Sequence, residues 1–336
     1  MSTIALRKLG TDGPMVFPFA LGCMGMAGKG MYGATDEKEC IATIHAALDA
    51  GVTLLDTGDF YGMGHNELLI GDAMAGRRRD EVLISVKFGA QRGPDGSGLG
   101  YDARPAAVKS ALAYSLQRLR TDHVDIYRPA RLDPNVPIEE TVGAIAELVQ
   151  AGYVRHIGLS EVGAETVRRA AAVHPICDLQ IEYSLISRGI ERTILPTCRE
   201  LEIGITAYGV LSRGLISGRY RADAEPQDGD MRGRMPRFQG ENLRHNLALV
   251  DELRGLAEAK DATVAQIAFA WVLSRGEDIV PLIGARRRDQ LTEALGAVEL
   301  VLTPEDVERI EQAIPPDAAA GDRYAAPQMA NLDSER

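Results

Sequence analysis

Eight short apolar stretches alternate with amphipathic, helix-like segments along most of the chain, and this alternation constrains the fold more than any other feature. The apolar stretches span residues 16–21, 53–56, 82–87, 124–128, 154–159, 178–182, 203–208 and 279–283. Runs of this length and character are typical of strands that are covered on both faces. Because strands that alternate with helices form parallel sheets, the eight units predict an α/β fold of the (β/α)8, or TIM, barrel type.

Start and stop signals bound the helices between these strands. Asp36 and Glu39 have the spacing of a capping box, and Gly51 follows the apolar stripe of that helix as a stop. Pro105 and Pro137 suit the first turns of the two helices that they open. The segments between the strands are therefore predicted to be helices that cover the outside of the barrel.

The length of 336 residues allows two domains or one large barrel. No linker or internal repeat divides the sequence, so we expect one domain over 1–336, with a core of about 16–300. The stretch 217–242 is rich in Arg, Gly and Asp and predicts a long loop over the barrel mouth after the seventh strand. Residues 315–336, rich in Pro, Ala and Gly, are expected to form a tail outside the core.

Composition excludes several classes of partner and cofactor. The net charge is −11 and argues against nucleic acid or an anionic membrane surface as a partner. No apolar run is long enough for a membrane span, and the N-terminus lacks the apolar stretch of a secretion signal. The cysteines are widely spaced and without metal-ligand patterns, so we expect a reduced, cytoplasmic protein with no metal site; they are Cys23, Cys40, Cys177 and Cys198.

Polar residues at the ends of the second and third strands suggest a proton donor. Asp56 ends one strand, Tyr61 follows it by five residues, and Lys87 ends the next strand. In such barrels the reactive groups come from these carboxyl ends. A lysine that pairs with a carboxylate and lies near a tyrosine favours phenolate, which makes Tyr61 a candidate acid. The alternative is a purely structural Asp56–Lys87 ion pair beside a loop aromatic residue.

Later strand ends carry groups that suit a nucleotide. Ser160 and Gln180 end the fifth and sixth strands and are types that read an amide, although either could be an ordinary satisfied core residue. After the seventh strand, Tyr208 offers a flat face for stacking, while Ser212 and Arg213 suit phosphate.

An arginine run follows the eighth strand and precedes a helix. Arg286, Arg287 and Arg288 come directly after Gly284-Ala285, and Gln290 and Glu293 lie on the helix that follows. Barrels often hold phosphate at this position, so we expect an anion site, although a solvated basic turn is the commoner fate of such a run. Neither a Rossmann glycine fingerprint nor a P-loop is present.

Several motifs, in order, resemble the aldo-keto reductase family over nearly the whole chain. They are Ala-Leu-Gly-Cys-Met-Gly near residue 20, Leu-Asp-Thr-Gly-Asp-Phe-Tyr-Gly-Met-Gly-His-Asn-Glu, Ile-Ser-Val-Lys-Phe-Gly, Asp-Pro-Asn-Val-Pro-Ile-Glu-Glu-Thr-Val-Gly, Tyr-Val-Arg-His-Ile-Gly-Leu-Ser-Glu and Leu-Ile-Gly-Ala-Arg-Arg-Arg-Asp-Gln-Leu. The resemblance implies a barrel that binds NADPH without a Rossmann fold and reduces aldehydes or ketones.

The same resemblance implies roles for individual residues. Tyr61 would be the general acid, with Lys87 lowering its pKa and Asp56 orienting Lys87. Ser160 and Gln180 would hold the nicotinamide carboxamide. Tyr208 would stack on the ring, Ser212 and Arg213 would lie near the pyrophosphate, Arg286 and Arg288 near the 2′-phosphate, and Gln290 and Glu293 near the adenine. The remaining cofactor-binding positions that it implies are Gly22, Met24, Gly209, Leu211, Gly214 and Gly284.

One position departs from the family pattern. The family normally has a catalytic histidine after the fourth strand, and Ala130 stands there in this chain. Losing a comparable donor to the substrate oxygen costs about 2.7–4 kcal/mol. Strand alternation points Arg128 into the barrel, so we expect it to supply the missing hydrogen bond or to pair with Asp56. If Pro129 bulges the strand, Arg131 is the alternative.

Three functions are consistent with these residues. The first is an NADPH-dependent carbonyl reductase, and the second is an NADP(H)-binding regulatory sensor with little or no turnover, which Ala130 favours. The third is an aldolase or isomerase that uses Lys87 as a Schiff-base nucleophile. The substrate is expected to be a small carbonyl compound whose identity depends on loops 24–34, 91–103 and 217–242 and on the tail. Phe60, Phe238 and Tyr324 are candidates for lining its pocket, whereas His65 is expected at the rim.

Overall fold

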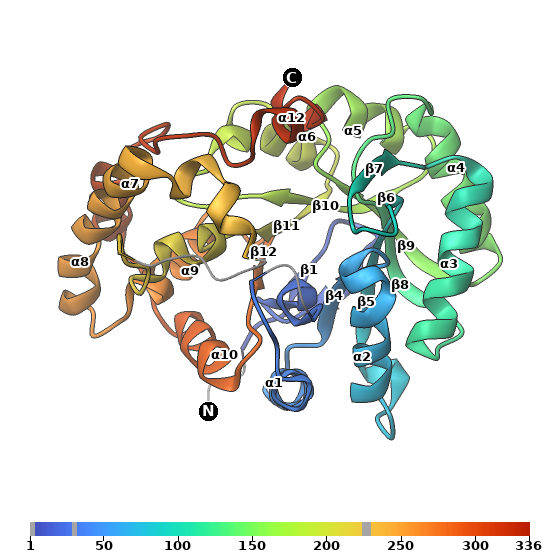
Figure 1. Ribbon diagram of the computed structural model, residues 1–336, viewed down its shortest axis with the longest axis horizontal. Coiled ribbons are helices and arrows are strands. Elements are labelled where there is room, and N and C mark those ends of the chain that lie inside the picture. The colour runs from blue at the N-terminus through green and yellow to red at the C-terminus, as the bar shows by residue number, and fades with distance from the viewer. Residues whose placement is uncertain (1–3, 29–31, 224–229) are drawn as a thin grey trace.

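Eight parallel strands close into a barrel in the computed structural model, which describes residues 4–28, 32–223 and 230–336 (Figure 1). Around the barrel the order is β10-β11-β12-β3-β4-β5-β8-β9. The strands are β3 (Ala20–Gly22), β4 (Leu54–Gly58), β5 (Leu83–Phe88), β8 (Val124–Pro129), β9 (Val154–Ser160), β10 (Ile176–Glu182), β11 (Gly204–Tyr208) and β12 (Ile279–Ile283). The predicted (β/α)8 architecture is confirmed.

Helices surround the barrel and lie mainly where the sequence signals predict them. They are α1 (Glu37–Asp49), α2 (His65–Ala73), α3 (Pro105–Leu119), α4 (Ile138–Gln150), α5 (Ala164–Ala171), α6 (Ile194–Glu200), α7 (Gly240–Glu252), α8 (Arg254–Ala259), α9 (Val264–Ser274), α10 (Arg288–Leu295), α11 (Pro304–Ala313) and α12 (Ala326–Met329). Asp36 caps α1, as predicted, by accepting the N–H groups of Lys38 and Glu39. The Glu39 side chain binds Arg288 instead of completing the capping box.

The predicted first strand, 16–21, is divided into two elements. β1 (Arg7–Lys8) and β2 (Met15–Val16) form an antiparallel hairpin, and the barrel strand begins only at Ala20. Pro18 lies between them and has no N–H to donate to a strand ladder, which explains the interruption. Leu9 and Val16 of the hairpin segment are buried with Leu54 and other residues inside the barrel, so the hairpin contributes to its interior core.

The long connection between β11 and β12 is only partly a loop. The expected loop 217–242 contains short 3-10 turns at Met231–Arg234 and Pro236–Phe238, and α7 begins at Gly240. Residues 224–229 of that loop lie outside the described part of the chain. The rest of the extra length forms α7, α8 and α9, so three helices account for most of it.

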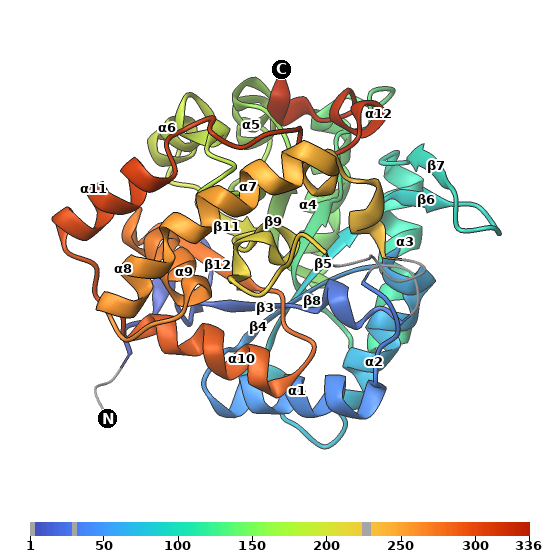
Figure 2. The same cartoon turned by 60° about the vertical axis from the view of Figure 1, so that its left-hand side comes forward.

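The C-terminal segment is not a tail outside the core, and this corrects the expectation for 315–336. In Figures 1 and 2 the red segment leaves α11, passes α7 and reaches α12. The Asp333 carboxylate there accepts the N–H of Gly163, just before α5, at 2.8 Å. Arg323 is 7% exposed and its side chain is buried against strand ends. The segment therefore covers the carboxyl end of the barrel. A second hairpin, β6 (Ala90–Arg92) with β7 (Gly98–Tyr101), projects from the molecule (Figure 2).

An ion pair is buried inside the barrel. Arg128 on β8 is fully buried, as the strand alternation predicts, and its Nη1 lies 3.0 Å from Oδ2 of Asp178 on β10. Its Nη2 donates to Ser85 Oγ at 3.0 Å, and Asp178 also accepts the hydroxyl of Thr206. Arg128 therefore pairs with Asp178 and not with Asp56, and it does not reach toward the barrel mouth. The hypothesis that it replaces the usual histidine is not supported by this geometry.

We predict that Arg128→Met lowers the free energy of unfolding by about 3–5 kcal/mol, because it leaves the Asp178 carboxylate buried without its cation. Urea unfolding measures the change. The double variant Arg128→Met/Asp178→Asn should recover part of the loss. Equal stability of Arg128→Met and the wild type would contradict the structural role assigned to this pair.

Candidate active site

The Asp56 carboxylate lies at the centre of the site and accepts three side-chain hydrogen bonds. Lys87 Nζ donates to Oδ2 at 2.6 Å, and Ser85 Oγ and Gln180 Nε2 donate to Oδ1 at 3.0 and 2.8 Å. The β4–β5 register sets Asp56 opposite Ser85, so both donors from β5 lie on its inward face. Burial lowers the pKa of Lys87, and the adjacent Asp56 charge opposes that effect. The expected Asp56–Lys87 pair is therefore present.

Tyr61 is buried beside this pair, on the turn that follows β4. Its ring centroid lies 5.0 Å from Lys87 Nζ and packs against Phe60 at 4.8 Å. The turn needs glycine at Gly62, which has φ +57° and where a Cβ would lie 2.4 Å from the Ala27 carbonyl oxygen. Burial and the Asp56 charge raise the pKa of Tyr61 well above 10, and the Arg131 cation opposes them. Tyr61 therefore holds its proton, as an acid must.

Arg131 follows Ala130 directly after the end of β8. Its Nη1 donates to the Ala130 carbonyl oxygen at 2.6 Å. Within the described residues it has no carboxylate at ion-pair distance. Burial alone would lower the pKa of Arg131, but its neighbours Tyr208, Tyr324 and Glu161 raise it. Of the two arginines, Arg131 is the one whose charge opposes the rise in the pKa of Tyr61.

Two serine hydroxyls expected to contact a nucleotide are buried without partners. Ser160 Oγ at the end of β9 and Ser212 Oγ after β11 make no hydrogen bond in the described part of the protein. Gln180, the other expected amide reader, already donates its Nε2 to Asp56. A buried hydroxyl without a partner is unfavourable, so both serines are groups that a ligand could satisfy.

The backbone after β11 forms a turn of left-handed residues. Gly209, Ser212, Arg213 and Gly214 all have positive φ, at 70°, 43°, 58° and 93°. The N–H groups of Ser212 and Gly214 donate to the carbonyl oxygens of Gly209 and Leu211 at 2.7 and 2.9 Å, so the turn is held by its own hydrogen bonds. Non-glycine residues adopt this region at a cost, and Ser212 and Arg213 do so side by side at the position where the sequence predicts phosphate contacts.

The three arginines after β12 differ in their partners. Arg287 pairs with Asp289 at 2.9 Å, and Arg288 forms a two-pronged contact with Glu39 at 3.2 and 3.0 Å. Arg286 has no carboxylate partner among the residues that the structure describes; its guanidinium donates a hydrogen bond to the Ala34 carbonyl oxygen at 3.4 Å. Arg286 is therefore the member of the run whose charge is available to an anion.

The remaining expected positions lie around the same end of the barrel or beside it. Gly22 pairs with Asp56 across β3 and β4, Met24 lies in the 3-10 turn Cys23–Met26, and Leu211 immediately precedes the Ser212–Ser217 turn. Gly284 follows β12 and is open to solvent. Gln290 accepts the N–H of Arg286 at 3.2 Å, and Glu293 pairs with Arg219 at 2.8 Å.

The three candidate pocket residues do not all have the same neighbours. Phe238 packs against Tyr220 at 5.1 Å, whereas Phe60 and Tyr324 both lie near Tyr61. His65 pairs with Glu37 at 3.2 Å, as expected for a rim residue.

Two buried glutamates at the mouth were missed by the sequence analysis. Glu161 follows Ser160, and Glu182 ends β10; both side chains are inaccessible to solvent. Glu161 Oε1 accepts the Tyr208 hydroxyl at 2.8 Å and the N–H of Glu182 at 2.9 Å. Strand alternation alone would have found Glu182, because it shares the inward face of β10 with Asp178 and Gln180.

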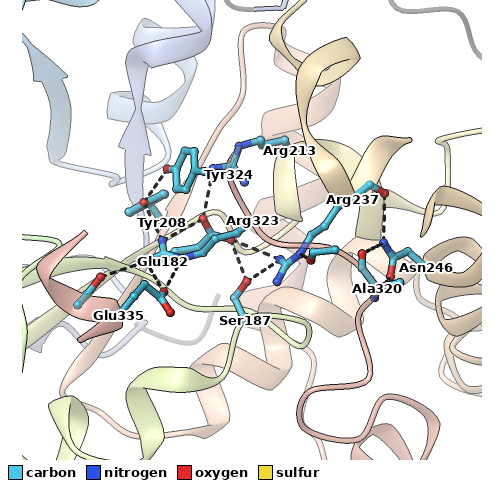
Figure 3. Close-up of polar contacts among 12 residues, drawn as sticks. Glu182, Ser187, Tyr208, Arg213, Arg237, Asn246, Ala320, Arg323, Tyr324 and Glu335 are labelled. Carbon is cyan, nitrogen blue, oxygen red and sulfur yellow. Dashed lines mark hydrogen bonds and ion pairs between the residues drawn. The ribbon is translucent and has the colours of Figure 1, made fainter. Parts of the chain in front are cut away.

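The C-terminal segment enters this cluster, as Figure 3 shows. Arg323 contacts Glu161 at 2.6 and 3.0 Å and Glu182 at 3.4 Å. The Tyr324 hydroxyl lies 2.9 Å from that of Tyr208. The Arg213 guanidinium lies 4.5 Å from the centroid of the Tyr324 ring. The site is thus assembled from both halves of the chain and its last residues.

The described ranges contain no cluster of three or more side chains that could bind a metal ion. None of the helices in those ranges has the length and apolar character that a membrane span requires.

Comparisons with known proteins agree with this geometry. A sequence model of the Aldo/keto reductase family matches residues 18–315. "Probable aldo-keto reductase 1" from Glycine max is 42% identical over 319 residues, which cover 94% of this chain and 91% of that protein. A glycerol dehydrogenase from Gluconobacter oxydans superposes with a TM-score of 0.83 at 32% identity, covering 94% of this chain and 97% of that one. The holo form of an aldo-keto reductase from Bacillus halodurans gives 0.76 at 28% identity, covering 95% and 99%.

The fold and the comparisons together define an oxidoreductase that acts with a nicotinamide cofactor on small carbonyl compounds. The chain belongs to the aldo/keto reductase family, as the resemblance of its motifs implied.

Proposed function

We propose that this protein reduces an aldehyde or ketone with NADPH and that Tyr61 is the proton donor. The observation that carries the proposal is the convergence of a buried, protonated Tyr61 with the Lys87–Asp56 pair at the carboxyl end of the barrel. A phenol held there can donate its proton to a carbonyl oxygen that becomes an alkoxide.

Several groups in the site fit NADPH. Ser160 and Gln180 would hold the carboxamide, Tyr208 would stack on the nicotinamide, and Ser212 with Arg213 would hold the pyrophosphate. The unpartnered serine hydroxyls and the left-handed turn after β11 support these roles. Bound NADPH would supply the hydride to the carbonyl carbon. Gly22, Met24, Gly209, Leu211, Gly214 and Gly284 would line the cofactor, and Gln290 and Glu293 would lie at its adenine.

In this proposal Asp56, Lys87 and Arg131 each have a separate role in proton transfer from Tyr61. Asp56 keeps Lys87 charged and in place despite its burial. The Lys87 ammonium, which donates to Asp56 and lies near the Tyr61 ring, stabilises the phenolate that remains after Tyr61 gives up its proton. We infer that Arg131 supplies the hydrogen bond to the substrate oxygen that Ala130 cannot make, because its guanidinium lies at the Ala130 carbonyl and has no carboxylate partner among the described residues.

The relatives favour small substrates. The structural relative from Gluconobacter oxydans is a glycerol dehydrogenase, and by analogy a short hydroxylated aldehyde or ketone is a reasonable first substrate to test.

We predict that Tyr61→Phe lowers kcat for carbonyl reduction by about 10²–10⁴-fold, because it removes the proton that a general acid supplies. NADPH oxidation against a panel of aldehydes and ketones measures this, and NADPH binding by fluorescence should change little. Loss of cofactor binding would mean that the variant is damaged elsewhere. Unchanged turnover would contradict the assignment of Tyr61. A wild type that binds NADPH but reduces nothing in the panel would favour the regulatory sensor instead.

Arg131→Gln should lower kcat by about 10²–10³-fold, the effect of removing one donor to a developing oxyanion. Arg131→Lys should retain part of the rate, because it keeps a cation at the mouth. Arg155 is the matched control: it is exposed at the start of β9, at the opposite end of that strand from Ser160. If Arg155→Gln and Arg131→Gln reduce kcat equally, Arg131 has no particular role at the carbonyl.

Preference for NADPH over NADH is proposed to depend mainly on Arg286, with Arg288 as a secondary contact. Arg286→Leu should raise the Kd of NADPH at least tenfold, as expected for losing a charged phosphate contact, and leave that of NADH nearly unchanged. Arg288→Leu should have a smaller effect, because Glu39 already holds that guanidinium. Fluorescence titration with both cofactors measures the four constants. A similar loss of NADH affinity in Arg286→Leu would rule out specific 2′-phosphate recognition.

A further inference from the structure

The C-terminal segment is tied to the barrel mouth at several points in succession. The Asn246 amide on α7 exchanges two hydrogen bonds with the backbone of Ala320, at 2.9 and 2.8 Å. Arg237 Nε donates to the Gly321 carbonyl oxygen at 3.2 Å. Arg323 then enters the mouth and contacts Glu335 at 2.8 Å, further along the same segment (Figure 3). This part of the segment therefore has a defined place over the strand ends.

Arg323 lies between two carboxylates that are both ionised. Burial alone would raise the pKa of Glu161, but Arg323 and Arg131 lower it to about 2. The pKa of Glu182 is likewise lowered, against the effect of burial, by Arg213, Arg323 and Arg237. Two negative charges are therefore buried at the ends of β9 and β10, and Arg323 is the cation that contacts both.

Two of these three groups, Glu161 and Arg323, contact the hydroxyl of Tyr208. Tyr208 donates to Glu161 at 2.8 Å, and Arg323 Nη1 lies 3.4 Å from the phenolic oxygen. The cluster therefore directly contacts Tyr208, the residue on whose ring the nicotinamide is proposed to stack. Oxidised nicotinamide carries a positive charge and reduced nicotinamide does not, so the net charge at Tyr208 affects the two forms of the cofactor differently.

We propose that Arg323 is a positioning and charge-balancing residue of the nicotinamide site. It fixes Tyr208 through Glu161 and offsets the negative charge of the two buried glutamates. It thereby sets the ratio of the dissociation constants of NADP⁺ and NADPH. This inference rests on the proposed cofactor site. It makes residues 320–324 an integral part of that site, although they lie near the opposite end of the sequence from Asp56 and Tyr61.

The test is the ratio of the two dissociation constants, Kd(NADP⁺)/Kd(NADPH), measured by fluorescence titration or calorimetry on the full chain. Arg323→Met removes a positive charge beside the ring and should lower this ratio roughly tenfold, in favour of NADP⁺. Arg323→Lys should keep it near the wild-type value. Glu161→Gln alone removes a negative charge and should shift the ratio in the opposite direction, which tests the proposal even if Arg323→Met does not fold.

Two further variants separate charge from loss of docking. Arg323→Met/Glu161→Gln restores the charge balance and should return the ratio toward the wild-type value. Arg192→Met removes an exposed ion pair to Asp317, 2.6 Å long, that also holds the C-terminal segment but lies away from Tyr208. It should leave the ratio unchanged.

An unchanged ratio in both Arg323→Met and Glu161→Gln, or an equal shift in Arg192→Met, would overturn the inference. Failure of the wild type to bind either cofactor would instead overturn the proposed function on which the inference depends.

Discussion

The Asp56 carboxylate connects β4 to its neighbour β5 and to β10 on the opposite side of the barrel. It accepts hydrogen bonds from two residues of β5 and one of β10, and Ser85 extends the contact to Arg128 on β8. A carboxylate this deeply buried is tolerated only when its hydrogen-bonding capacity is satisfied. The strand register that sets Asp56 opposite Ser85 is therefore required by electrostatics as well as by packing. Because Tyr61 follows β4 closely, the same constraint determines where the proposed acid lies.

Charged side chains are buried at three depths along the barrel, and the charges at each depth are neutralised by different partners. Within the barrel, Arg128 and Asp178 compensate each other; above them, Lys87 and Asp56 do so. At the mouth, Glu161 pairs with Arg323 from the C-terminal segment, and Glu182 pairs with Arg213 and Arg237 as well as with Arg323. The two inner pairs join barrel strands that lie one or two positions apart, so the closed barrel is sufficient to form them. The outer cluster is complete only when the C-terminal segment packs onto the strand ends.

Much of the fold followed from local patterns, because a barrel strand and its helix are short-range features. The eight strands, the Asp36 cap and the Asp56–Lys87 pair were all predicted from periodicity and position. The prediction of one strand over 16–21 was wrong, because Pro18 interrupts the hydrogen-bond ladder and separates β2 from β3. The loop expected at 217–242 was wrong in part, because α7 begins within it.

Contacts between residues that are far apart in the sequence could not be predicted from local patterns. The inward direction of Arg128 was predictable by alternation, but its choice of Asp178 over Asp56 was not, because β10 and β4 both lie two strands from β8 and Asp56 is already paired with Lys87. Glu161 and Glu182 lie in recognisable strand ends, whereas Arg323 carries no local signal at all. Its role becomes visible only from its contacts with Glu161 and Glu182 in the folded protein.

A crystal structure of the full chain with NADP⁺ bound would test the central claim most directly. The account predicts the nicotinamide ring stacked on Tyr208, its carboxamide at Ser160 and Gln180, the 2′-phosphate at Arg286, and Arg323 still between Glu161 and Glu182. A nicotinamide bound elsewhere, or bound only after Arg323 and Tyr324 have left the mouth, would contradict it.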